Sequence, residues 1–203
     1  MRRRLLCYGD SNTYGYDPRS YLGGRYPESI RWTALLKGCG WKVHNAGGNG
    51  RSIPRSDREI DIAVQALCRM DADILTVMLG SNDLLQATRT SAKECAERME
   101  RFLTALLNAD GWSNSRKILL VAPPPMALGA WVQDEEIIAA SRYLPECYED
   151  TARPLGIDYA DAGAWGVGLS YDGVHFSEKG HLTFAKGMQT ALRHFALKES
   201  MPS

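Results

Sequence analysis

The sequence has no excess of charge of either sign. Of its 203 residues, 24 are Lys or Arg and 24 are Asp or Glu, so the formal net charge is +0. Binding to nucleic acid or to an anionic membrane relies on a basic surface, and this balance supports neither partner. We therefore expect a small and weakly charged partner.

Paired cysteines and long apolar runs are missing as well. The five cysteines are odd in number, widely spread and without C-x-x-C spacing, which argues against both a disulfide framework and a zinc knuckle. They are Cys7, Cys39, Cys68, Cys95 and Cys147. A reducing compartment is therefore expected. After the basic start, the apolar stretch Leu5–Tyr8 is shorter than the about 7 to 15 residues of a signal-peptide core. No run approaches the roughly 20 apolar residues of a membrane span. We expect a cytoplasmic protein without a membrane segment.

Short apolar runs alternate with amphipathic stretches along the chain. Five of these runs are bounded by Gly, Asp, Asn or Pro, which is typical of buried strands. They are Arg4–Tyr8, Trp41–His44, Ile74–Leu79, Lys117–Ala122 and Ile157–Tyr159. Such alternation predicts a parallel sheet with helices on both faces. Without a linker or repeat, residues 1–203 are expected to form a single α/β domain.

Between these strands, apolar residues recur at the spacing of an α-helix, which predicts helices there. S-x-x-E capping boxes start two predicted helices, at Ser56–Glu59 and Ser91–Glu94. A third helical pattern, Ile137–Leu144, meets Pro145, where a helix has to end, restart or bend. The last helix is expected to dock on the sheet through one apolar stripe, Leu182, Ala185, Met188, Leu192 and Phe195.

A serine stands where the first predicted strand ends. The segment Gly9-Asp10-Ser11-Asn12 places Ser11 at the carboxyl edge of the sheet, where ligands of parallel sheets bind. A serine hydroxyl becomes a nucleophile only when a base takes its proton, so a catalytic role requires a histidine elsewhere. The alternative is that Asp10 or Ser11 only caps the following helix.

A candidate base lies near the other end of the chain. In Asp172-Gly173-Val174-His175, the carboxylate can hold one imidazole nitrogen and leave the other free to act as a base. The alternative is a surface turn with a solvated Asp172. Two Gly- and Asn-rich loops, Asn45–Gly50 and Gly80–Asp83, follow the second and third strands and offer donors for an oxyanion, although each could also be an ordinary turn.

In their order along the chain, these four segments resemble the conserved blocks of the SGNH hydrolase superfamily, also called the GDSL esterases and lipases. The resemblance extends from Gly9 to His175. It implies a flavodoxin-like three-layer α/β/α sandwich with a five-stranded parallel sheet. It also implies ester hydrolysis through an acyl-enzyme without a metal or organic cofactor. The stretch Tyr14–Pro18 is similar to the arylesterase and acyltransferase branch, which often forms oligomers, so a homo-oligomer is expected.

The resemblance also implies roles for individual residues. Ser11 would be the nucleophile, His175 the general base and acid, and Asp172 the residue that orients the histidine. The oxyanion hole would consist of the Ser11 and Gly50 backbone N–H groups and the Asn82 side-chain amide. Within the second block, Gly48 is the alternative to Gly50. The family name has leucine where this sequence has Asn12, a departure expected to affect only local packing.

Several further residues are candidates for the substrate pocket, with a core or interface position as the alternative. They are Asp10, Asn12, Tyr14, Tyr16, Trp131 and Trp165. Arg51 and Arg55 flank the glycine loop and could meet a polar group of a substrate. His44, His181 and His194 have no metal-ligand spacing, so no metal site is expected. The apolar loop Met126–Glu135 would cover the pocket mouth or contact a second subunit.

The sequence therefore predicts a serine esterase for short-chain esters, with acetyl as the expected acyl group. The alcohol can be an aryl alcohol, a sugar or a simple alcohol, and acyl transfer is a close variant of the hydrolysis. The alternative is a non-catalytic flavodoxin-like domain that binds a sugar or a small anion. A flavin or nucleotide protein of this topology is disfavoured, because the G-x-G-x-x-G fingerprint and the Walker loop are missing.

Overall fold

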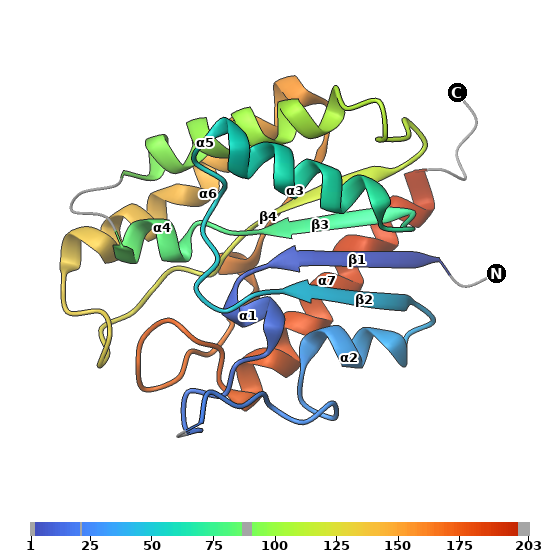
Figure 1. Cartoon of the computed structure of the whole chain (residues 1–203). Helices are drawn as coiled ribbons and strands as arrows, with labels where there is room; N and C mark the ends of the chain where they lie inside the picture. The colour runs from blue at the N-terminus through green and yellow to red at the C-terminus, as the bar shows by residue number, and fades with distance from the viewer. Residues whose placement is uncertain (1–2, 21, 87–90, 199–203) are drawn as a thin grey trace.

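Five parallel strands form a single sheet in the centre of the molecule (Figure 1). The computed structural model describes residues 3–20, 22–86 and 91–198. The strand order is β2-β1-β3-β4-β5, which is the flavodoxin-like order. The strands are β1 (Arg4–Gly9), β2 (Lys42–Gly47), β3 (Ile74–Met78), β4 (Lys117–Ala122) and β5 (Asp158–Asp161). The predicted fold class, including the number of strands, is confirmed.

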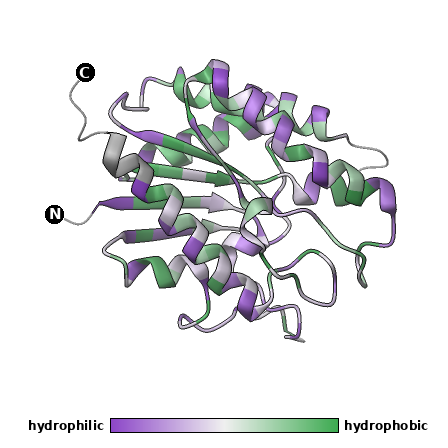
Figure 2. Ribbon diagram, turned by 180° about the vertical axis from the view of Figure 1, so that it is seen from behind, coloured by the Kyte–Doolittle hydropathy of each residue, from purple (hydrophilic) through white to green (hydrophobic). Residues whose placement is uncertain are grey.

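Helices cover both faces of the sheet (Figure 1). One face packs against α3 (Asp57–Arg69), α5 (Ala92–Leu107) and α6 (Glu135–Leu155). The other face packs against α2 (Trp32–Lys37) and α7 (Glu178–Lys198). Short helices follow three of the strands, namely α1 (Ser11–Tyr14), α4 (Ser81–Gln86) and the 3-10 helix η1 (Ala162–Trp165). Figure 2 shows hydrophobic and hydrophilic residues alternating along the helices, as expected for helices with one buried side.

The end of β1 fixes where the chain can turn. Gly9 pairs with Gly47 of β2 on one side and with Met78 of β3 on the other, so the three strands end level with one another. A Cβ atom at Gly9 would lie 2.2 Å from Thr13 Oγ1 and 2.7 Å from the Met78 carbonyl oxygen. Only glycine therefore allows α1 to start immediately beyond the strand.

The two predicted capping boxes are confirmed. In α3 the Glu59 N–H donates to Ser56 Oγ at 3.3 Å, and the Ser56 N–H donates back to Glu59 Oε2 at 3.0 Å. In α5 the corresponding distances between Ser91 and Glu94 are 3.2 and 2.7 Å. Each box satisfies two backbone donors that the first turn of a helix leaves without a partner.

Three expectations about the elements need correction. β2 extends to Gly47 rather than ending at His44, because Asn45–Gly47 pair with Cys7–Gly9. Of the three outcomes expected at Pro145, an end and a restart are wrong, because the helix continues through the proline as α6 with buried side chains on both sides of it.

In α7, Leu182 is 44% exposed, and Phe184 contributes the buried side chain instead. Ala185, Met188 and Leu192 lie in the core as expected, whereas the side chains of His194 and Phe195 lie outside the described residues. In the described part of the chain, no helix combines the length and the apolar character that spanning a membrane requires.

The larger core cluster depends on Phe102. This side chain of α5 is fully buried, and its ring centroid lies 6.0 Å from that of Tyr8 on β1. We expect Phe102→Ala to lower the free energy of unfolding by about 3 to 5 kcal/mol through lost transfer energy and a cavity. Urea unfolding measures this, with Tyr143→Ala, an exposed position of α6, as the control within about 0.5 kcal/mol of wild type. Equal losses in the two variants would contradict this description of the core.

Candidate active site

A chain of hydrogen bonds joins the serine, the histidine and the aspartate singled out from the sequence. Ser11 Oγ lies 3.0 Å from His175 Nε2, and His175 Nδ1 lies 2.7 Å from Asp172 Oδ2. Ser11 is the first residue of α1, directly beyond β1, while the other two lie on the loop between η1 and α7. All three are buried. The structure therefore brings together groups that are 164 residues apart in the sequence.

The Asp172 carboxylate holds both the imidazole and the turn that carries it. Its Oδ1 accepts from the Val174 and His175 N–H groups, each at 2.9 Å, while Oδ2 faces the imidazole. Burial alone would raise the pKa of Asp172, but the hydrogen bonds from the His175 side chain and from the two backbone N–H groups outweigh this effect and lower it. The carboxylate is therefore ionised at neutral pH and can stabilise a positively charged imidazole.

Asn12 makes contacts that its expected roles did not include. Its side-chain Oδ1 accepts from the Phe176 N–H at 2.8 Å, and its Nδ2 donates to the Val174 carbonyl at 3.1 Å. The residue is buried. This placement does not support the expected pocket role of Asn12, and the contacts of Asn12 extend beyond local packing to the loop that carries His175.

Asp10 also faces the protein rather than a pocket. Its Oδ1 accepts from the Asn12 N–H at 2.9 Å and caps the N-terminus of α1, which was the alternative considered from the sequence. Burial of this carboxyl raises its pKa to about 6, although hydrogen bonds from the Asn12 and Thr13 backbone and the nearby charges of His175 and Arg51 partly oppose the shift. The expected pocket role of Asp10 is not supported by this placement.

The glycine loop after β2 lies next to the end of β1. The Gly48 N–H donates to the Gly9 carbonyl at 3.0 Å, so it is already used. Gly50 has a φ of +70°, and no heavy atom lies within 4 Å of the position where a Cβ would stand. This geometry favours Gly50 over Gly48 as a donor to a ligand.

Asn82 lies on the first turn of α4 and is tied to the same loop. Its Nδ2 donates to the Arg51 carbonyl at 3.0 Å. A side-chain amide carries two N–H bonds, so one of them is left for a second acceptor. The neighbouring Asp83 is fully buried and accepts from the Ile53 N–H at 3.0 Å, which fixes the loop from its other side.

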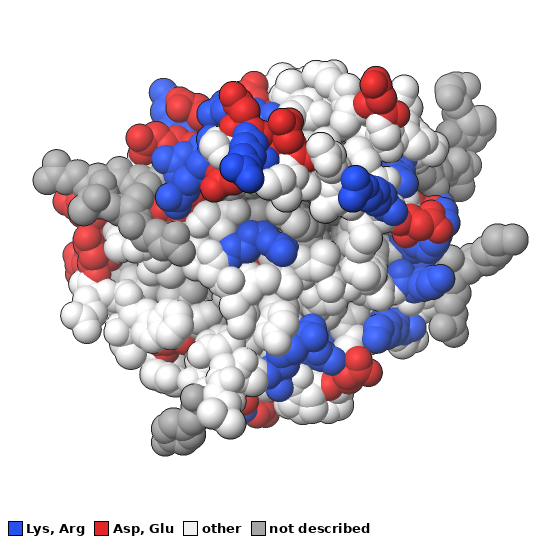
Figure 3. Space-filling view, in the orientation of Figure 1, with Lys and Arg blue, Asp and Glu red and all other residues white. Residues whose placement is uncertain are grey.

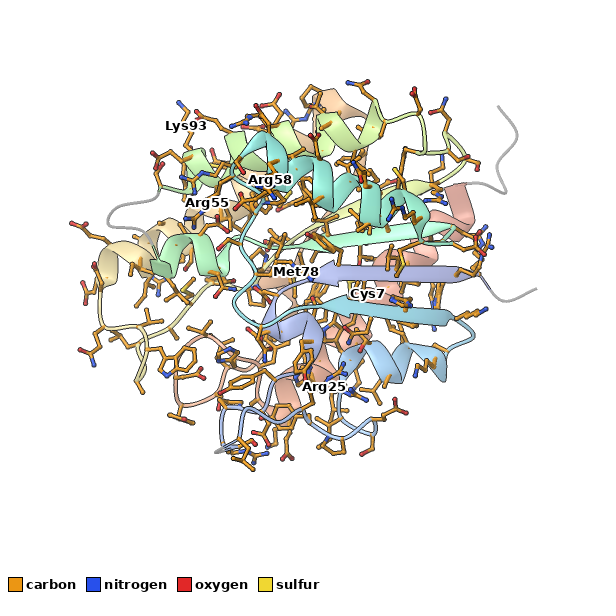
Figure 4. All side chains as sticks on the ribbon, viewed as in Figure 1. Cys7, Arg25, Arg55, Arg58, Met78 and Lys93 are labelled. Carbon is orange, nitrogen blue, oxygen red and sulfur yellow. The ribbon has the colours of Figure 1, made fainter. Side chains whose placement is uncertain are left out.

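Arg51 stabilises the strand ends, which its position in the sequence did not reveal. Its guanidinium donates to the Gly9 carbonyl at 2.9 Å and also to the Ala46 carbonyl, and it lies 4.5 Å from the centroid of the Tyr8 ring. These contacts occupy the cation that was expected to meet a polar group of a substrate. Arg55, labelled in Figure 4, lies on the loop before α3, 3.7 Å from Asp83.

Two aromatic rings flank His175. The ring centroids of Tyr16 and Trp131 lie 4.7 and 4.9 Å from that of the imidazole. Trp131 belongs to the loop between β4 and α6 and is 55% exposed. Its backbone N–H donates to the Asp172 carbonyl at 3.1 Å. The apolar loop Met126–Glu135 is therefore in contact with the site, as expected for a loop at the pocket mouth.

The other two aromatic candidates are turned elsewhere. Trp165 of η1 packs on α7, with its ring centroid 5.1 Å from that of Phe184, and it belongs to the core under that helix. The guanidinium of Arg25, labelled in Figure 4, lies 4.1 Å from the centroid of the Tyr14 ring. The packing of Trp165 favours the core alternative for this residue, and Tyr14 pairs with an arginine.

Charge is sparse around the loops at the carboxyl edge. In Figure 3 the charged side chains gather over α3 and α5, whereas the lower left of the view, where the loops of the site lie in Figure 1, is mostly uncharged. Among the described residues, no group of three or more His, Cys, Asp or Glu side chains has an arrangement that could hold a metal ion.

His181 lies behind the site with both ring nitrogens unpartnered among the described residues. It is fully buried between the rings of Tyr26 and Phe176. Burial, together with the charge of Arg31, lowers the pKa of His181 to about 4, although the charge of Asp17 opposes the shift. The unfolded chain therefore binds the proton more readily than the folded protein does between pH 6.5 and 4.

The free energy of unfolding therefore has its full contribution from neutral His181 above pH 6.5. It falls by about 3 kcal/mol as the pH is lowered towards 4. We expect His181→Leu to remove this part of the pH dependence, since leucine cannot be protonated. Urea unfolding at several pH values between 4 and 7 measures the difference between the two proteins. His44→Gln, at an exposed position of β2, serves as the control and keeps the wild-type slope. An unchanged slope in His181→Leu would contradict the assignment.

A serine, a histidine and an aspartate joined in this way at the edge of a parallel sheet form the arrangement used by serine hydrolases. The chain belongs to the GDSL-like lipase/acylhydrolase family, whose model matches residues 7–182. It is thus a carboxylic ester hydrolase of the SGNH superfamily, as its sequence predicts.

Solved structures agree with this assignment. The native aryl esterase of M. smegmatis is 26% identical, with a TM-score of 0.81 over 96% of this chain and 99% of that one. A carbohydrate acetylesterase family member from Sinorhizobium meliloti is 27% identical, with a TM-score of 0.80 over 95% and 98% of the two chains. A lipolytic G-D-S-L family protein from Veillonella parvula DSM 2008, 16% identical over 92% and 96% with a TM-score of 0.67, shares the fold. No curated protein matches the sequence significantly.

Proposed function

We propose that this protein is a serine esterase that hydrolyses short-chain esters, acetyl esters above all, through an acyl-enzyme on Ser11. The observation that carries the proposal is the unbroken hydrogen-bond chain from Asp172 through His175 to Ser11. A domain that only binds a ligand has no need to align these three groups. The non-catalytic alternative considered from the sequence is therefore disfavoured.

In the first half of the reaction, Ser11 Oγ attacks the carbonyl carbon of the ester while its proton passes to His175 Nε2. A tetrahedral intermediate with a negatively charged oxygen results. When it collapses, the bond to the alcohol oxygen breaks and His175 returns the proton to that oxygen. Asp172 stays ionised throughout and stabilises the imidazolium.

Three donors are proposed to stabilise the negatively charged oxygen: the N–H groups of Ser11 and Gly50 and the free N–H of the Asn82 side chain. The first residue of a helix has no intrahelical acceptor for its N–H, so that of Ser11 is available. Such donors act most strongly when they are fixed in advance. The bond from Asn82 to the Arg51 carbonyl and the bonds from the Arg51 side chain to Gly9 and Ala46 supply this rigidity.

In the second half, His175 takes a proton from water, the water oxygen attacks the acyl carbon, and the bond to Ser11 Oγ breaks as the proton returns to the serine. Another alcohol or hydrogen peroxide can replace water at this step, which gives acyl transfer instead of hydrolysis. The Trp131 side chain beside His175 is 55% exposed, which supports the approach of such acceptors from solvent.

The proposed alcohol carries a ring. Because His175 gives its proton to the departing alcohol, that part of the substrate has to lie beside the imidazole, where the Tyr16 and Trp131 rings stand. Aromatic side chains stack on aryl groups and on the apolar faces of sugars. The solved structures named above include an aryl esterase and a carbohydrate acetylesterase, which fits either kind of alcohol.

The exposed Trp131 and Leu128 side chains also support the predicted association of subunits.

The function is tested by hydrolysis of p-nitrophenyl acetate, butyrate and octanoate at pH 7 to 8. We expect activity that falls with chain length in the wild type and that disappears in Ser11→Ala and His175→Ala, since each variant lacks a group that moves in the reaction. Circular dichroism shows that the variants are folded. Turnover that persists in Ser11→Ala would contradict the proposal, and an inert wild type would favour the binding domain.

Asn82→Ala tests the oxyanion donor separately. Loss of one such donor is expected to lower kcat by about 10² to 10³, with a much smaller change in KM, because the interaction strengthens only in the transition state. Steady-state kinetics with p-nitrophenyl acetate measures both constants. Wild-type kcat in this variant would exclude Asn82 from the oxyanion hole.

A further inference from the structure

Asn12 holds the loop of His175 on both sides of that residue. Its Oδ1 accepts from the N–H of Phe176, and its Nδ2 donates to the carbonyl of Val174, at 2.8 and 3.1 Å. The two partners directly precede and directly follow His175 in the chain. A single carboxamide therefore fixes the backbone from which the imidazole projects.

Asn12 is itself fixed by neighbouring elements. Its N–H donates to Asp10 Oδ1 at 2.9 Å, and its carbonyl accepts from the indole N–H of Trp32 at 3.0 Å. The side chain is buried, so water does not compete for its hydrogen bonds. Asn12 is the residue after Ser11, and these two bonds fix its backbone to Asp10 at the start of α1 and to Trp32 of α2.

The hydrogen bond between Asp172 and His175 does not connect the loop of His175 to α1. Asp172 orients the imidazole, but it lies only three residues away on the same loop and would move with that loop. In the described part of the chain, the hydrogen bonds between α1 and residues 172–176 are the two made by the Asn12 side chain and the Ser11–His175 bond itself. Backbone N–H groups of Ala127 and Trp131 hold Gly173 and Asp172 against the loop between β4 and α6. Asn12 is the residue that ties the loop of His175 to α1, the helix that carries Ser11.

We propose that Asn12 is a positioning residue that keeps His175 within hydrogen-bonding distance of Ser11, a role that rests on the serine esterase function proposed above. The leucine that the family name has at this position offers neither a donor nor an acceptor. In this protein a leucine would leave the buried Phe176 N–H and Val174 carbonyl unpaired, and the loop would shift to reach other partners. A displacement of a catalytic group by about 1 Å can lower the rate of the reaction by about 10²-fold.

The test is the reaction of Ser11 with diethyl p-nitrophenyl phosphate. Ser11 Oγ bonds to phosphorus, the bond to the p-nitrophenyl oxygen breaks, and the serine proton passes to His175. The amplitude of the p-nitrophenolate release counts the folded sites, and the rate constant reports how well His175 activates the serine. For Asn12→Leu we expect an amplitude near one per chain and a rate constant about 10- to 100-fold lower than in the wild type.

Tyr159→Phe is the matched control. It removes a partly buried hydrogen bond between β5 and α6, from the Tyr159 hydroxyl to the Pro145 carbonyl at 2.8 Å, and it lies outside the site. We expect wild-type amplitude and rate constant for this variant. If Asn12→Leu does not fold, Asn12→Asp replaces it, because aspartate keeps the size of the side chain and the acceptor for Phe176 but loses the donor to Val174.

A several-fold lower rate constant at full amplitude supports the role in either variant. A wild-type rate constant overturns it, as does a loss confined to the amplitude, which indicates a purely structural role. The kcat for p-nitrophenyl acetate should fall with the rate constant while KM stays within about twofold. Wild type and Ser11→Ala are run in parallel, so failure of the esterase function itself appears as an inert wild type and is not confused with an unaffected Asn12 variant.

Discussion

The pairing of β1 with strands on both of its sides is the constraint on which the rest of the site depends. Because this pairing continues to Gly9, the ends of β1, β2 and β3 lie level, and the segments that leave them share one edge. The close approach of Thr13 and the Met78 carbonyl leaves room at Gly9 only for hydrogen. The position of Ser11 is therefore set by the register of a buried sheet rather than by the preferences of an exposed loop.

Most polar side chains around Ser11 bind the protein itself. Asp10 caps α1, Asn12 holds the loop of His175, and the Arg51 guanidinium pairs with carbonyl groups at the ends of two strands. Each of these groups satisfies backbone atoms where regular structure stops, and buried backbone atoms left unpaired would be costly. Rigidity at the site thus comes from residues that need never touch a substrate.

The sequence predicts best those features whose physical cause is local. The capping boxes at Ser56 and Ser91 depend on residues three positions away, and both formed as predicted. The family resemblance implied that Ser11 and His175 act together, and a parallel sheet allows this because segments that follow its strands can meet at one edge. The burial of Asn12, the packing of Trp165 on α7 and the extension of β2 to Gly47 depend on contacts between distant segments. Residue spacing and composition do not reveal which distant segments come into contact, so these three features could not be predicted.

The distance along the chain between Ser11 and His175 has a consequence for folding. The two residues come from the first strand and from the loop before the last helix, so the hydrogen bond between them closes only after the intervening sheet has been assembled. Contacts of such long sequence separation form late, because a large loop has to be closed first. An incomplete chain emerging from a ribosome therefore carries the serine without its base. Recovery of reactivity during refolding consequently reports closure of the whole chain, which a spectroscopic signal from helices alone does not.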